Sequence, residues 1–320
     1  MNLFENTINC ISIFILLVFA TFYLRARGIL KSSNAPTIAR LITELILPAY
    51  LFHQLAFANL SIAALKAAGS LIIVEIILAS LSYPLGKYLL KMNGSTLAIF
   101  VLCSTFSSTG LLGNSFLKLI YDTDAMAIAQ GIIIGQLAIT TPNYLLTPAI
   151  LSQFQSTNKK NSLSFHLHSF FFNPPNLAIF LGLLWAFLNI ETNQFFLEPI
   201  FGSMKLMGET ISFLVALSIG LSLKHFPERK DLRAILICGF FILIAEPILA
   251  YFIDQWTGAK NLDQQVSFLL GAMPAAPIIA VYAIRYETDP KFASTLITAT
   301  TVMSAVTIPI LMFCFRSLLM

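Results

Sequence analysis

The hydrophobic residues of this chain fall into long runs that are separated by short polar segments. A membrane-spanning helix needs about 20 mostly apolar residues, and ten runs are long enough to meet this requirement. They lie near residues 4–24, 34–57, 67–90, 96–120, 125–150, 165–189, 197–221, 233–253, 266–285 and 292–316. The pattern therefore predicts an all-α polytopic membrane protein with ten transmembrane helices.

The composition agrees with this prediction. Hydrophobic residues make up 57% of the 320 residues and charged residues only 11%, whereas a soluble domain carries about 25% charged residues. This balance excludes a globular enzyme that is held by a single membrane anchor.

The Lys and Arg residues of the predicted loops indicate an orientation, because cytoplasmic loops are enriched in these residues. None precedes the first run and several follow it, which is the reverse of a cleaved signal peptide. With the N-terminus outside, thirteen lie on the cytoplasmic side: Arg25, Arg27, Lys31, Lys87, Lys91, Lys159, Lys160, Lys224, Arg229, Lys230, Arg233, Arg285 and Lys291. Only Lys66, Lys118, Lys260 and Arg316 lie outside. We predict a multi-pass protein of the cell inner (plasma) membrane with both termini outside, in the periplasm.

The chain divides into two similar halves. The longest polar interruption, residues 153–164, separates five runs from five, so the second half must insert upside down. A Tyr-acid-Thr-Asp sequence follows the fourth run at 121–124 and the ninth run at 286–289, and a Thr-x-Pro occurs in the next run of each half. We predict a first five-helix repeat at 1–155, a cytoplasmic linker at 156–164 and a second, inverted repeat at 165–320.

The fourth and ninth runs are both interrupted by residues that break helices. Ser and Thr residues lead to Gly110 and Gly113 in the fourth run, and Pro274 and Pro277 interrupt the ninth. Glycine permits non-helical backbone, and proline removes an amide donor. Interrupted helices at matching positions of two halves are typical of the binding site of a secondary transporter.

Several short motifs, in order along nearly the whole chain, carry a resemblance to a known family. They are Tyr23-Leu24-Arg25-Ala26-Arg27-Gly28-Ile29-Leu30, Leu47-Pro48-Ala49, Gly110-Leu111-Leu112-Gly113, Asn173-Pro174, Met273-Pro274-Ala275-Ala276 and Ala283-Ile284-Arg285-Tyr286. With them the chain resembles a bacterial member of the auxin efflux carrier family, which includes plant auxin exporters and bacterial organic-anion carriers. The resemblance implies a scaffold of helices 1, 2, 6 and 7, a mobile core of the other six, broken helices 4 and 9 that cross, and a homodimer.

The chain departs from the family pattern close to the expected site. Ser108 and Pro277 stand where members usually carry Asn, and Ser115 stands where they usually carry Pro. The ligand can therefore differ from the typical one.

The two breaks favour an anion as substrate. Each helix restarts beyond its break, so two N-termini, each equivalent to about half a positive charge, point at one place, and neither break contains a carboxylate. We predict a secondary transporter that moves a small organic anion, a carboxylate, by alternating access. The candidate substrate-binding residues are Ser107, Ser108, Thr109, Gly110, Gly113, Asn114, Met273, Pro274, Ala275, Ala276 and Pro277.

Two acidic residues, Glu75 and Glu246, lie deep in the third and eighth runs. A charged side chain there costs about 2.5 kcal/mol or more unless it is paired. They are candidates for coupling to a proton or a cation, and a structural hydrogen bond to a neighbouring helix is the alternative. A sodium-coupled carrier similar to the bile-acid symporters is the alternative within transport.

Other classes of function lack support in the sequence. The four cysteines have no ligand spacing, and His166 and His168 lack a third ligand, so we expect neither a metal nor a cofactor. No hydrolase motif is present, and an intramembrane hydrolase would depend on His53 as its base. A membrane sensor without transport also remains an alternative. We expect no catalytic residues, no nucleic-acid partner, and contacts with the lipid bilayer and a second copy.

Overall fold

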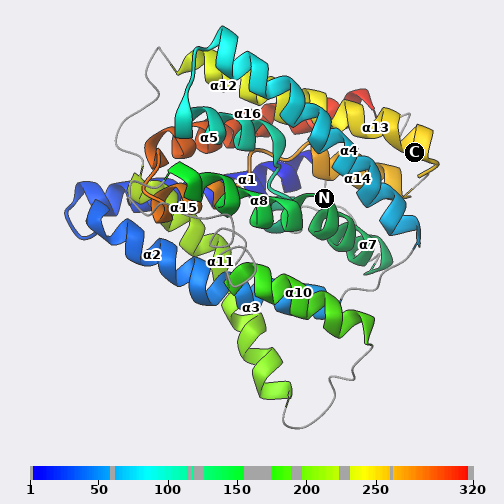
Figure 1. The fold of residues 1–320 in the computed structure, drawn as a ribbon, viewed down its shortest axis with the longest axis horizontal. Helices are drawn as coiled ribbons and strands as arrows, with labels where there is room; N and C mark the ends of the chain where they lie inside the picture. Colours follow the sequence, from blue (N-terminus) through cyan, green and yellow to red (C-terminus); the bar gives the residue numbers. More distant parts are fainter. Residues whose placement is uncertain are drawn as a thin grey trace.

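The computed structural model describes residues 3–57, 62–113, 117, 125–154, 174–188, 197–222, 231–259 and 262–315. Within these ranges the chain is helical and forms no strand apart from one isolated bridge (Figure 1). The protein is thus an all-α polytopic membrane protein, as predicted. The predicted linker at 156–164 and the sequence at 121–124 lie outside the described residues.

The helices follow one another as listed here. The first half contains α1 (Leu3–Ala26), α2 (Ala35–Leu41), α3 (Leu47–Ala56), α4 (Ile62–Pro84), α5 (Gly94–Thr105), α7 (Ala125–Gly135) and α8 (Thr141–Leu151). The second half contains α10 (Pro174–Phe187), α11 (Glu198–Ser222), α12 (Leu232–Phe240), α13 (Glu246–Thr257), α14 (Leu262–Gly271), α15 (Ile278–Arg285) and α16 (Pro290–Cys314). Two short 3₁₀ turns, η1 (Ser32–Asn34) and η6 (Ser152–Phe154), flank α2 and α8.

Five stretches of the described chain are long and apolar enough to cross a membrane. They are Ser32–His53, Ala64–Leu89, Glu198–Ser218, Leu232–Thr257 and Pro290–Cys314. Three shorter apolar helices are Leu16–Ala26, Gly94–Thr105 and Pro174–Phe187. The fourth and ninth predicted spans do not qualify as single helices because each is broken near its middle. The number ten and the inverted repeat therefore stay predictions.

Five turns of π-helix interrupt the α-helices within the described residues, a feature that the sequence did not predict. They are η2 (Ile42–Ile46), η3 (Leu85–Leu89), η4 (Thr109–Gly113), η5 (Gln136–Thr140) and η7 (Phe241–Ala245). The second residue after η2, η5 and η7 is a proline: Pro48, Pro142 and Pro247. Proline lacks the amide donor and its ring clashes with the carbonyl four residues earlier. The wider turn, in which Glu246 N–H bonds to Phe241 O, accommodates that clash.

The helices form two packed groups. In Figure 1, α3, α10 and the lower part of α11 stand apart from α4, α5, α12 and α13. Rings of Phe52, Trp185 and Phe201 pack together, with centroids 5.6–6.0 Å apart, and join α3, α10 and α11. Gly220 allows α11 to approach α1 closely, since a Cβ atom there would lie 2.6 Å from the Thr21 Cβ. The second group contains both interrupted segments, α5–η4 and α14–α15.

Candidate substrate-binding site

The two interrupted segments meet and satisfy each other's backbone. α5 ends at Thr105 and α14 ends at Gly271, and Ser107 and Ala275 then form an antiparallel bridge. Ser108 N–H donates to Pro274 O at 2.7 Å, and Ala276 N–H donates to Phe106 O at 2.9 Å. Broken helices expose polar backbone groups that a membrane tolerates only where protein or water pairs with them. The bridge meets part of that requirement for both segments at once.

Side chains of neighbouring helices hold this bridge in place. The Thr300 hydroxyl of α16 accepts a hydrogen bond from Ala275 N–H at 3.3 Å. Ser107 Oγ donates to Leu270 O at 3.2 Å. On the other side, Thr109 Oγ1 lies 2.9 Å from Thr140 Oγ1, the last residue of η5. The bridge is therefore tied to three separate helical segments.

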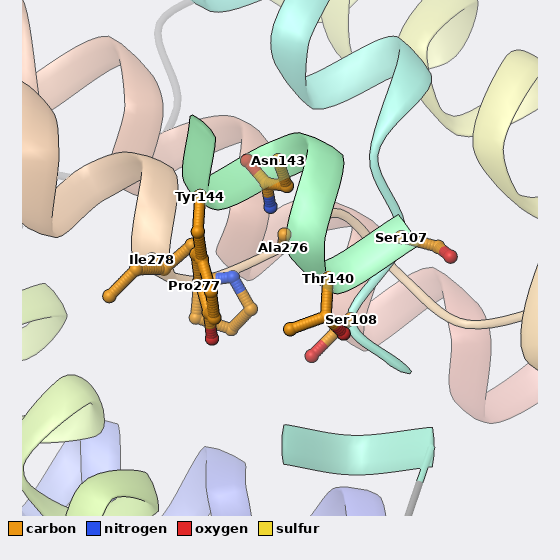
Figure 2. A pocket seen from close by; sticks show the side chains of 8 residues that line it. All are labelled: Ser107, Ser108, Thr140, Asn143, Tyr144, Ala276, Pro277 and Ile278. Carbon is orange, nitrogen blue, oxygen red and sulfur yellow. The ribbon is translucent and has the colours of Figure 1, made fainter. Parts of the chain in front are cut away.

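A small pocket opens beside the bridge (Figure 2). Its lining comes from the two interrupted segments and from the η5–α8 segment: Ser107, Ser108, Ala276, Pro277, Ile278, Thr140, Asn143 and Tyr144. The pocket has room for about one water molecule, and none of its lining side chains is charged. A larger ligand would require the pocket to widen.

Some of the predicted site residues line this pocket and others do not. Ser107, Ser108, Ala276 and Pro277 line the pocket. The other predicted residues belong to the same segments without lining it: Thr109, Gly110 and Gly113 in η4, and Met273, Pro274 and Ala275 at the second break. Asn114 lies outside the described residues.

Thr140, Asn143 and Tyr144 line the pocket, and our sequence analysis did not assign them to the site. They surround Pro142 in an otherwise apolar run, and that polar cluster was the signal available in the sequence. The π-turn η5 ends at Thr140, and its geometry sets the face that the following residues present to the pocket.

The polar groups at the pocket include donors that protein atoms do not fully use. The buried Ser108 Oγ has no hydrogen-bond partner among the described residues. Asn143 Oδ1 accepts from Thr147 Oγ1 at 2.6 Å, which leaves its NH₂ group for the pocket, and in Figure 2 the amide nitrogen points toward Ala276. α15 begins at Ile278 without a side-chain cap, and Pro277 and Ile278 line the pocket, so the positive end of this helix lies beside it. The amides of Ile279 and Ala280 already bond to Ala276 O and Pro277 O.

Glu75 and Glu246 are both buried, and neither lines the pocket. Among the described residues neither carboxyl group has a hydrogen bond of normal distance and angle, and the Ser107 hydroxyl is the polar side chain that interacts with Glu246. Glu246 lies directly behind the second break, because a Cβ atom at Gly271 would lie 3.4 Å from its Cγ. The described residues hold no group of three or more His, Cys, Asp or Glu side chains that could bind a metal ion. His166 and His168 lie outside the described residues.

Comparison with known proteins supports the resemblance. The family described as membrane transport protein matches residues 7–312. An uncharacterized transporter of Methanocaldococcus jannaschii is 23% identical over 304 residues, which cover 94% of this chain and 96% of the relative. An uncharacterized transporter of Methanothermobacter thermautotrophicus is 24% identical over 304 residues, with 92% and 94% covered. The chain therefore belongs to the membrane transport protein family, the auxin efflux carrier family that its motifs resemble, and is a multi-pass membrane transporter.

Proposed function

We propose that this transporter is a secondary carrier that moves a small organic anion, a carboxylate, across the inner membrane by alternating access. The observation that carries this proposal is the pocket at the meeting point of the two interrupted segments, which offers hydrogen-bond donors and no acidic side chain. Ten spans in an inverted five-plus-five arrangement and a homodimer complete the proposal.

Electrostatics at the pocket favour a negative ligand. The N-terminus of α15 carries the equivalent of about half a positive charge, and helix N-termini are common binding sites for anions. Ser108 Oγ and the Asn143 amide add two donors that protein atoms do not fully use. A cationic ligand would find no carboxylate among the lining residues.

The packing of the helices supports movement of one group against the other. The pocket lining comes from α5–η4, η5–α8 and α14–α15, whereas α3 packs mainly against α10 and α1 packs mainly against α11. α1 and α11 also contact α16, and α11 contacts α15. One polar connection joins the groups where α15 ends: Arg285 donates to Thr43 Oγ1, and its Nη1 lies 3.2 Å from Glu44 Oε1. Movement of α15 relative to η2 would break this connection, so we place it at a sliding surface of the transport cycle.

The test is a thermal-shift screen of the purified protein against a panel of small carboxylates and matched amines, followed by uptake of radiolabelled hits into liposomes. Carboxylates should stabilise the wild type. Ser108→Ala should weaken the affinity for them by about tenfold or more, because a hydrogen bond to a charged group contributes about 1.5–3 kcal/mol.

Ser203→Ala is a matched control, because Ser203 is exposed on α11 and its hydroxyl bonds only within its own helix, to Ile200 O. This variant should behave as the wild type does. Stabilisation by amines alone, with Ser108→Ala responding to every carboxylate as the wild type does, would contradict the anion proposal.

A further inference from the structure

We propose that Glu75 and Glu246 form a proton-binding pair behind the meeting point of the two interrupted segments, and that this pair couples anion transport to a proton gradient. Proton binding by the pair is argued from the burial of the two carboxyl groups and the packing of their helices. The coupling rests on the proposed function, and the experiments below separate the two.

The two carboxyl groups are buried on helices that pack against each other. Glu75 lies near the middle of α4, and Glu246 is the first residue of α13, directly after the π-turn η7. α4 packs against α13, and the Glu246 carboxyl interacts electrostatically with that of Glu75. Their side chains are 5% and 0% exposed.

No positive charge compensates this pair within the described residues. Besides the pair, α4 and α13 carry four titratable side chains: Lys66, Tyr83, Tyr251 and Asp254. The elements that pack against α4 or α13 are α5, α14, η3, α7, η5 and η7. Their titratable side chains are Cys103, Asp263, Lys87 and Tyr88. Lys87 is exposed and lies twelve residues beyond Glu75, about 18 Å along the helix. Lys66 lies nine residues before Glu75, at the opposite end of α4 and about 14 Å away.

Two buried carboxylates without a counter-charge are prohibitively costly, since desolvation of each ion costs several kcal/mol and their repulsion adds to it. One proton shared between the two groups removes one charge and creates a carboxyl–carboxylate hydrogen bond in which both groups find a partner. Divalent cations such as Ca²⁺ and Mg²⁺ instead need six or more oxygen ligands, and the described residues contain no metal-binding cluster. The pair therefore suits a proton better than a divalent cation, and the experiment below includes sodium as the competing ion.

The pair lies close to the segment that lines the pocket. Ser107 and Ser108 both line the pocket (Figure 2). The Ser107 hydroxyl also bonds to Leu270 O, next to the Gly271 position that contacts Glu246. A change of charge at the pair thus acts on the segment that binds the anion.

Two further acidic residues, Asp254 and Asp263, lie near the C-terminal end of α13 and the start of α14. Asp254 lies eight residues beyond Glu246, about 12 Å along the helix; it is buried beside Ser70 and Ser267. Asp263, at the start of α14, is partly exposed and interacts electrostatically with Asp254.

Infrared difference spectroscopy tests proton binding without any substrate. The wild type should show the C=O stretching band of a protonated carboxyl group that shifts in D₂O and disappears as the pH is raised. The double variant Glu75→Gln/Glu246→Gln should lose this band, and each single variant should shift it, because the pair is then broken. The control Glu209→Gln, at an exposed position of α11, should leave it unchanged. An unchanged band in the double variant, or a band that sodium ions remove at constant pH, would overturn the proposal.

Liposome uptake of radiolabelled malate and malonate tests the coupling. In the wild type and in Glu209→Gln, an inward proton gradient should raise the uptake rate severalfold. In the single Glu75→Gln and Glu246→Gln variants the ratio of rates with and without the gradient should fall to about one. If the proton gradient does not change uptake by the wild type, the proposed coupling is wrong and the carrier function still stands. A titrating band in a protein that binds no carboxylate would refute the proposed function and leave the proton-binding pair standing.

Discussion

At the scale of single residues, Asn143 is the clearest donor that the pocket offers to an anion. Its Oδ1 is occupied by Thr147, so only its NH₂ group is available to a ligand. Asn143→Asp replaces that donor with an acceptor of nearly the same shape and adds a negative charge. We expect carboxylate affinity to fall by at least tenfold, because a charge-assisted hydrogen bond of about 1.5–3 kcal/mol is lost and repulsion is added. Isothermal titration of the purified protein measures this change.

Asn93→Asp is the matched control for this substitution, since Asn93 is exposed and immediately precedes α5. It should leave carboxylate affinity unchanged. Equal affinities of Asn143→Asp and the wild type would remove Asn143 from the binding site.

At this scale the sequence predicted pocket residues only where the residue type has few structural roles. Gly and Pro inside apolar runs marked both breaks, and the break residues Ser107, Ser108, Ala276 and Pro277 do line the pocket. Asn143 and Tyr144 were not predicted, because one polar residue in a membrane helix can face a neighbouring helix as readily as a cavity. Only the packing of α8 against the second break decides between these.

At the scale of helices, the close packing of α11 against α1 depends on a residue without a side chain. A Cβ atom at Gly220 would lie 2.6 Å from the Thr21 Cβ and 2.7 Å from the Val18 carbonyl oxygen. Backbone atoms cannot give way easily, so Gly220→Ala should destabilise the protein by about 1–3 kcal/mol. We expect a lower melting temperature in detergent, measured by intrinsic fluorescence.

Gly202→Ala on the same helix is the matched control, because no atom lies within 4 Å of a Cβ at that position. Alanine is the better helix former by about 1 kcal/mol, so this variant should melt no earlier than the wild type. If Gly220→Ala melts at the same temperature as the control, α1 and α11 can move apart without a loss of stability.

Most of the described helices lie within the predicted runs, because an apolar run of membrane-spanning length favours a helix. The fourth and ninth runs are the exceptions, since each is broken. The π-turns were missed, although their cause is visible in Leu47-Pro48, Thr141-Pro142 and Glu246-Pro247. A proline within an apolar run is compatible with a kink, a break or a wider turn. The choice depends on whether neighbouring helices can pair with the freed carbonyl groups, and a single sequence does not contain that information.

At the scale of the whole molecule, the orientation in the membrane remains a prediction of the loop charges. A reporter that fluoresces only in the cytoplasm, fused after Met320, should give no signal if both termini lie outside. The same reporter in the central loop at residues 156–164 should be bright, since that segment is predicted to be cytoplasmic. A bright fusion at Met320 would contradict the arrangement of ten spans.

The bridge between the two interrupted segments has a consequence for how this carrier can change over time. Its two hydrogen bonds join backbone atoms only, from Ser108 to Pro274 and from Ala276 to Phe106. Mutations can therefore replace side chains at these positions and leave the two backbone hydrogen bonds of the bridge in place. Under the proposed function, a change of substrate preference can leave this backbone contact intact, so the pocket is a suitable place for directed evolution toward new ligands.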